Sequence, residues 1–78
     1  MRKLYEIAHE IRKDWGTANI NFAAAPYLNA MGDLQSINEN YFQDSGQEIV
    51  LRFLCNAGSW RGEVARRIKL ELKSMVKG

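Results

Sequence analysis

The sequence has one cysteine, one histidine and one proline among 78 residues. A single cysteine cannot form a disulfide within the chain, whereas small domains of oxidising compartments usually depend on several. No stretch approaches the roughly 18 consecutive apolar residues that a membrane-spanning helix needs. The N-terminal segment carries charge at Glu6, Glu10 and Arg12, unlike the apolar stretch of a secretory signal. These shortages predict a cytoplasmic protein without a membrane segment.

Residues that carry out catalysis or bind metals are equally scarce. His9 and Cys55 are the one pair that resembles a base and its nucleophile. The helical periodicity, however, places His9 on a polar face and Cys55 in an apolar arc, so we interpret the first as solvated and the second as buried and structural. No spacing matches a zinc site, a calcium loop, a phosphate-binding loop or a dinucleotide fingerprint. The sequence predicts no catalytic residue, no metal ligand and no cofactor, and therefore not an enzyme.

The composition is that of a folded domain. Apolar residues make up 46% and charged residues 26% of the chain. This apolar fraction is too high for an intrinsically disordered chain. The length suits a single helical domain over residues 1–78, with a radius of gyration of roughly 11–12 Å. A core this thin encloses no substrate cavity unless a second copy of the chain helps to build it. A homodimer is therefore one candidate assembly.

Apolar side chains recur at helical spacing in four segments, and no strand periodicity is present. They predict an all-α, compact four-helix domain with helices at about 3–15, 23–34, 45–57 and 60–76. Asp44 and Ser45 both fit the spacing of a cap for the third helix, and Ser59 is the expected cap of the fourth. The third helix is apolar around most of its circumference, which predicts that it lies at the centre. We expect segment 35–43 to be a loop, with one helical turn as the alternative.

Charge is distributed unevenly along the chain. Residues 14–51 hold five acidic side chains and no Lys or Arg, whereas residues 52–78 hold seven basic and two acidic side chains. Such asymmetry bears on binding partners rather than on fold. Nucleic acid is one candidate partner, because a basic stripe is predicted along the outer face of the last helix and the turn before it. The residues of this stripe are Arg61, Arg66, Lys69, Lys73 and Lys77.

The third and fourth predicted helices, with Gly58 between them, suggest a helix-turn-helix-like pair whose second member, the fourth helix, reads the major groove. Two positions disagree with a DNA-binding version of that motif. Leu54 stands where the motif has a small residue, and Arg67 stands where it has an apolar one. The alternative interpretation of the stripe is a solvated basic face.

A protein partner is the other candidate, and different residues support it. Tyr41 and Phe42 lie in an acidic, Asn-rich segment, and Leu70 is isolated on the polar face of the last helix. Trp60, beside Arg61, is a further aromatic that a partner or a stacked base would contact. Exposed aromatic residues are typical anchors of protein interfaces. The alternative is structural: Tyr41 and Phe42 fold back over the core, and Trp60 fills it.

Five segments read in order resemble a known group of sequences. They are residues 4–8 (Leu-Tyr-Glu-Ile-Ala), 26–28 (Pro-Tyr-Leu), 44–46 (Asp-Ser-Gly), 53–57 (Phe-Leu-Cys-Asn-Ala) and 59–69 (Ser-Trp-Arg-Gly-Glu-Val-Ala-Arg-Arg-Ile-Lys). Over nearly its whole length the chain is similar to short uncharacterised proteins of phages, plasmids and conjugative elements of Gram-positive bacteria. The resemblance implies a bacterial cytoplasm and a mobile-element setting, and it supplies no activity, cofactor or site residue.

In such a setting, small non-enzymatic proteins regulate transcription, assist replication or block host defences. We therefore expect a non-catalytic accessory protein that modulates a host or element process by binding a protein. The alternative is a nucleic-acid-binding protein that uses the basic helix 60–76.

Overall fold

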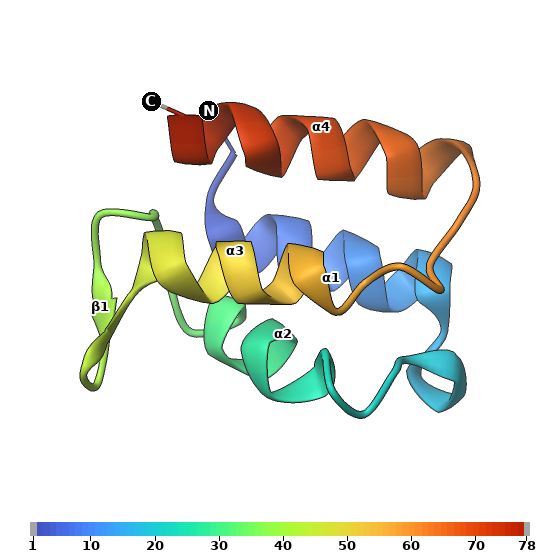
Figure 1. The fold of residues 1–78 in the computed structure, drawn as a ribbon, viewed down its shortest axis with the longest axis horizontal. Coiled ribbons are helices and arrows are strands. Elements are labelled where there is room, and N and C mark those ends of the chain that lie inside the picture. Colours follow the sequence, from blue (N-terminus) through green and yellow to red (C-terminus); the bar gives the residue numbers. More distant parts are fainter. Residues whose placement is uncertain (1, 78) are drawn as a thin grey trace.

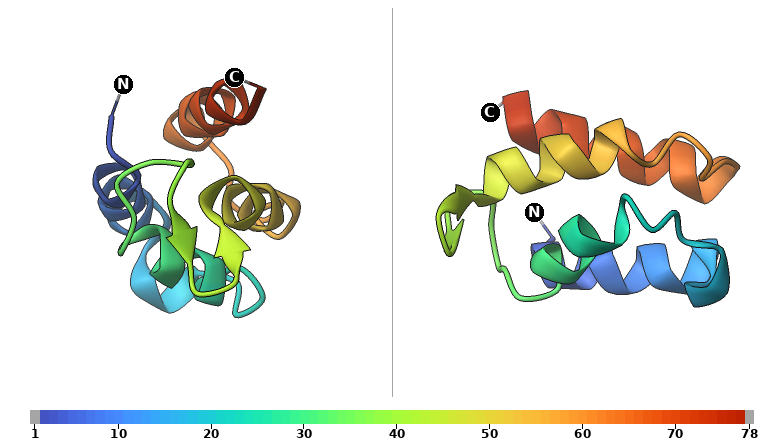
Figure 2. Two further views of the ribbon diagram at one scale, coloured as in Figure 1. Left: turned by 90° about the vertical axis from the view of Figure 1, so that its left-hand side faces the viewer. Right: turned by 60° about the horizontal axis from the view of Figure 1, so that its bottom comes forward.

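Four α-helices form most of the part of the chain that the computed structural model describes, residues 2–77. Successive helices run in opposite directions and close a ring in which each helix packs against its two neighbours (Figures 1 and 2). The predicted all-α, compact four-helix fold is confirmed. The helices are α1 (Leu4–Trp15), α2 (Ala25–Met31), α3 (Gly46–Cys55) and α4 (Glu63–Lys77), with a 3₁₀-helix η1 (Thr17–Asn19) after α1.

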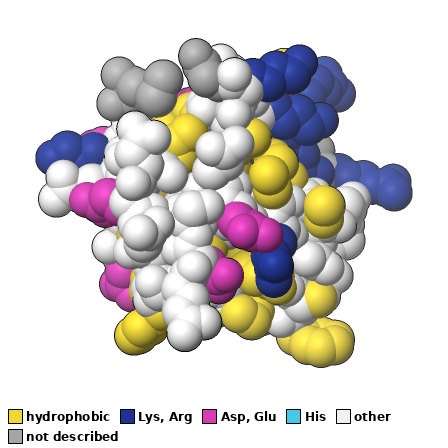
Figure 3. Space-filling model, turned by 60° about the vertical axis from the view of Figure 1, so that its left-hand side comes forward, with side chains coloured by type: hydrophobic (Ala, Val, Ile, Leu, Met, Phe, Trp, Pro, Cys, Tyr) yellow, Lys and Arg dark blue, Asp and Glu magenta, His cyan; other side chains and the backbone are white. Residues whose placement is uncertain are grey.

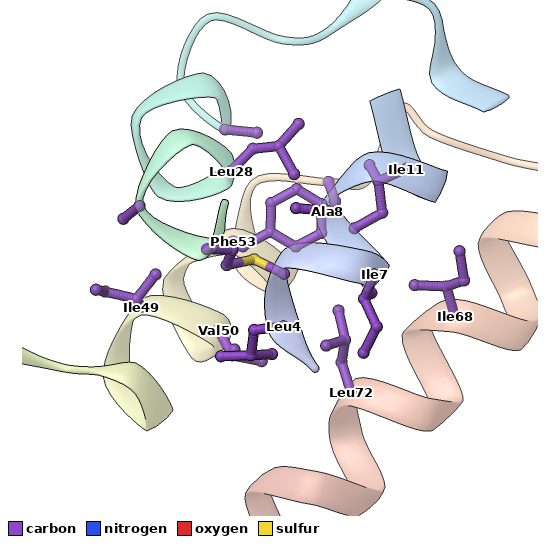
Figure 4. Packing of buried hydrophobic residues seen from close by; sticks show 14 of the residues in the cluster. Leu4, Ile7, Ala8, Ile11, Leu28, Ile49, Val50, Phe53, Ile68 and Leu72 are labelled. Carbon is purple, nitrogen blue, oxygen red and sulfur yellow. The ribbon is translucent and has the colours of Figure 1, made fainter. Parts of the chain in front are cut away.

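One apolar stripe from each helix fills the centre of this ring. Phe53 of α3 reaches across to Ala8 and Leu28, and Ile68 of α4 points toward Ile7 of α1 (Figure 4). All five side chains are buried. The stripes follow the spacing of about 3.6 residues that predicted the helices, because only one side of each helix can face a shared core.

The helix ends differ from the prediction where backbone geometry decides them. Of the two predicted cap candidates, Asp44 and Ser45, the structure selects Ser45, since its Oγ accepts a hydrogen bond of 3.1 Å from the backbone N–H of Glu48. The predicted cap at Ser59 is wrong, because α4 begins only at Glu63. Gly62 has a φ of +114°, a left-handed conformation that interrupts the helix before that point. Helix α2 is also shorter than predicted and ends at Met31.

The prediction that the third helix lies at the centre is also wrong. Leu51 of α3 is 44% exposed, and Cys55 at its end is exposed as well. In a ring of four helices each helix has an outward side, so α3 leaves part of its apolar circumference at the surface. Its buried side consists of Ile49, Val50 and Phe53.

A small β-hairpin occupies part of the segment predicted as a loop. Strand β1 (Asn40–Tyr41) pairs antiparallel with β2 (Asp44–Ser45), and the turn between them consists of Phe42 and Gln43. Two backbone hydrogen bonds fix the base of the hairpin to the start of α3: Gly46 N–H to the Glu39 carbonyl, 2.6 Å, and Gln47 N–H to the Ile37 carbonyl, 3.1 Å. Two-residue strands are too short to show alternation in the sequence, which is why the prediction missed them.

The radius of gyration is 11.1 Å, within the range expected from the length. Within residues 2–77, no helix has both the length and the apolar character needed to cross a membrane.

Candidate functional site

The basic residues predicted as a stripe lie together on one side of α4 and in the loop before it. They are here called the basic surface, which consists of Arg61, Arg66, Lys69, Lys73 and Lys77. Most Lys and Arg side chains on the face shown in Figure 3 gather at the upper right, where α4 lies. None of the five takes part in an ion pair with another residue of the segment 2–77.

On the opposite flank of α4, basic side chains form ion pairs with acidic ones. Arg2 bridges two carboxylates, with distances of 2.5 Å to Glu10 of α1 and 2.7 Å to Glu71 of α4. Arg67 also pairs with Glu10. These contacts join residues that are up to 69 positions apart in the sequence, so sequence spacing gave no signal for them. Positive charge is thus left uncompensated on one side of α4 only.

Lys69 occupies a distinct position within the basic surface. Its Nζ donates a hydrogen bond of 2.7 Å to the backbone carbonyl of Trp60 and lies 5.8 Å from the centroid of the Trp60 ring. Burial, together with the charges of Lys73 and Arg61, lowers the pKa of Lys69 below that of a free lysine. A like-charge cluster of this kind favours a bound anion.

Trp60 is not available to a partner. It is only 2% exposed, its ring stacks on Trp15 at a centroid distance of 5.6 Å, and its Nε1–H donates to Asp14. This corrects the prediction that Trp60 contacts a protein or a nucleic-acid base. The ring instead fills the end of the core and fixes the loop that carries Arg61.

Helices α3 and α4 do not form a helix-turn-helix arrangement. Residues 56–62 separate them, and the two helices run antiparallel (Figure 1). A helix-turn-helix joins its helices by a turn of about 3–4 residues and crosses them at about 90–120°. The late start of α4 at Glu63 lengthens the link, which is why the predicted motif does not form.

The hairpin presents one aromatic side chain and partly buries the other. Tyr41 packs against the core, whereas Phe42 at the tip is 87% exposed. The two rings meet edge to face with centroids 4.8 Å apart. Phe42 has a φ of +58°, the one non-glycine residue with positive φ in the described chain. The predicted interface residue Leu70 is also exposed, at 62%, on the outer side of α4.

The two residues considered for nucleophilic chemistry lie at the surface. His9 lines an open groove of about 670 Å³ between α1 and α2, together with Glu6, Arg12 and Asp33. The prediction that Cys55 is buried is wrong, since it is exposed near the end of α3. No group of three or more His, Cys, Asp or Glu side chains in residues 2–77 is placed to hold a metal ion.

Comparison of the chain with known protein families, with curated proteins and with solved structures gave no match.

Proposed function

We propose that this chain is a non-catalytic accessory protein that acts by binding another protein through the hairpin. The observation that carries the proposal is the combination of exposure and backbone strain at Phe42. A bulky residue in the left-handed region costs about 1–2 kcal/mol, and glycine or asparagine would avoid much of this cost. Because the ring is exposed, burial in the core does not offset the strain. An interface that uses the ring as an anchor would explain it.

Charges around the hairpin indicate the chemistry of the partner. Glu39 and Asp44 flank the tip, both exposed, and the nearest Lys or Arg along the chain after them is Arg52. Arg52 is engaged with Glu48 at 3.1 Å. We therefore expect the partner to offer an apolar pocket for the ring, bordered by Lys or Arg side chains.

The experiment is a binding measurement with two matched phenylalanine variants. Phe22 is 88% exposed and lies in the segment between η1 and α2, so Phe22→Ala removes an equally exposed ring from elsewhere. The partner is first recovered from a lysate of a Gram-positive bacterium and then titrated as a purified protein. Phe42→Ala is expected to abolish binding and Phe22→Ala to preserve it. Equal effects of the two substitutions would reject the hairpin as the interface.

A second candidate function is nucleic-acid binding, which the uncompensated charge of the basic surface favours. If four phosphates are neutralised, the logarithm of the affinity for duplex DNA should fall with the logarithm of salt concentration at a slope of about −3.6. A titration at two salt concentrations measures this slope. Absence of binding at low salt would eliminate this candidate.

The setting that we propose is the bacterial cytoplasm and a phage or other mobile element. The resemblance of the five sequence segments supports it. A second copy of the chain remains a candidate partner for either surface, and sedimentation analysis tests it directly.

A further inference from the structure

A hollow of about 330 Å³ lies at the start of α4, within the basic surface. Among residues 2–77, three cationic side chains line it and no carboxylate does, in contrast to the mixed charges of the groove between α1 and α2. Glu63, the acidic residue in the first turn of α4, is not part of the lining. The lining residues are Trp60, Arg61, Gly62, Ala65, Arg66 and Lys69.

The floor of this hollow is held in place from several directions. Trp60 stacks on Trp15, meets Phe53 edge to face at 6.4 Å, and is hydrogen-bonded to Asp14 at 2.9 Å. The Lys69 ammonium is in turn fixed by its bond to the Trp60 carbonyl. An ammonium has three N–H donors, so this bond leaves two for a ligand. The site therefore has a preorganised cation, which lowers the ordering cost of binding.

We propose that this hollow binds a phosphoryl group, held by Arg61, Arg66 and Lys69. Guanidinium groups donate paired hydrogen bonds to phosphate oxygens, and an ammonium adds a compact charge. Lys73, which follows Lys69 by one helical turn, extends the positive surface beyond the hollow. One source of the phosphoryl group is the backbone of a nucleic acid. For that source, the inference rests on the second candidate function, nucleic-acid binding. A free phosphate compound is the other source.

The test is a titration of the ¹⁵N-labelled 78-residue chain with sodium pyrophosphate, followed by backbone and indole NMR signals. Saturable shifts are expected for residues 60–69, including the Trp60 indole. Arg66→Gln is expected to weaken binding by about tenfold or more, because it removes charge-assisted hydrogen-bond donors from the hollow. Arg66 is exposed, so this variant keeps the fold, and Lys69→Gln gives a second test inside the hollow.

Lys13→Gln is the matched control. Lys13 is an exposed cation on α1, and its replacement changes the net charge by the same amount as Arg66→Gln. If both substitutions weaken pyrophosphate binding equally, or if the shifts lie outside residues 60–69, the proposed site is refuted. Absence of any saturable shift refutes it as well.

A second titration, with a DNA duplex, separates the two sources. Competition between the duplex and pyrophosphate for the same residues identifies a nucleic-acid phosphate as the ligand. Pyrophosphate binding without duplex binding supports the proposed site and identifies free phosphate compounds as its ligands. The same result refutes nucleic-acid binding as a function. Duplex binding without pyrophosphate binding refutes the hollow but keeps that function. Phe42→Ala should leave both titrations unchanged, so the hairpin proposal stands or falls separately.

Discussion

The indole N–H of Trp60 donates a hydrogen bond of 2.9 Å to a carboxylate oxygen of Asp14, and this bond ties the loop before α4 to the last turn of α1. In Asp14→Ala, the indole N–H of Trp60 loses its hydrogen-bond acceptor while the ring stays buried. An unpaired buried donor costs about 1–3 kcal/mol, and we expect the free energy of unfolding to fall by that amount. Urea denaturation measures the difference.

Two further variants make this measurement specific. Asp14→Asn keeps an oxygen acceptor and should cost less than Asp14→Ala. Asp33→Ala removes an exposed acid that makes no hydrogen bond through its side chain within residues 2–77, so it should be nearly neutral. A loss for Asp33→Ala as large as that for Asp14→Ala would show that the hydrogen bond contributes nothing specific.

Gly46 and Gly58 form a second matched pair. A Cβ atom on Gly46 would lie 2.9 Å from both the Ile37 Cα and the Ser36 carbonyl oxygen, whereas one on Gly58 would have no neighbour within 4 Å. Backbone atoms cannot move aside easily, so Gly46→Ala should destabilise the protein by about 1–3 kcal/mol. Gly58→Ala should be neutral or stabilising by up to about 1 kcal/mol. Thermal and urea unfolding of both variants test this, and similar results for the two would contradict it.

The sequence predicted what local periodicity controls and missed what distant segments control. The apolar stripes predicted the four helices, and the Asp44-Ser45 pair marked the region where α3 starts. Gly46, however, is restricted by residues 36 and 37, which cross the start of α3 at close range. The end of the loop before α4 depends on the backbone of Gly62, and a glycine permits either a helical or a left-handed conformation.

The same distinction applies to the candidate sites. Periodicity correctly placed Arg66 and Lys69 near one another, since residues three apart share a helix face. It could not show that Arg67 is neutralised by Glu10, a residue 57 positions earlier. Nor could composition decide whether Trp60 or Phe42 is the exposed aromatic, because that depends on which ring the core accommodates. The basic surface was thus predictable as a set, and its charge balance was not.

The ion pairs between α1 and α4 make stability depend on pH. Hydrogen bonds from Arg2, and then from Arg67, lower the pKa of Glu10, and Arg2 likewise lowers the pKa of Glu71. These carboxyls bind fewer protons in the folded than in the unfolded chain, so stability rises with pH through this range. The stabilisation is complete above the ordinary glutamate pKa of about 4.3 and is lost as pH falls through the lowered values.

Glu10→Gln should therefore reduce stability at pH 7 and weaken its pH dependence below about pH 5. Because the pairs are partly exposed, we expect a loss of about 0.2–1 kcal/mol for each pair, and less at high salt. Urea unfolding at pH 7, 5, 4 and 3 measures it. Asp33→Asn is the control, since Asp33 is exposed and forms no ion pair within residues 2–77. Identical pH profiles for the two variants would show that the network has no effect.

Replacing Phe42 with glycine should separate stability from binding. Glycine adopts a φ of +58° without strain, and little buried surface is lost with an exposed ring. The relief of up to about 1–2 kcal/mol is partly offset by the greater freedom of glycine in the unfolded chain, so we expect a gain of up to about 1 kcal/mol. Phe42→Ala keeps the strained backbone and should gain nothing. Both variants should lose the partner that the hairpin binds. Chemical denaturation and titration of the same samples test the two halves of this prediction, and a destabilised Phe42→Gly variant would show that the ring supports the fold rather than an interface.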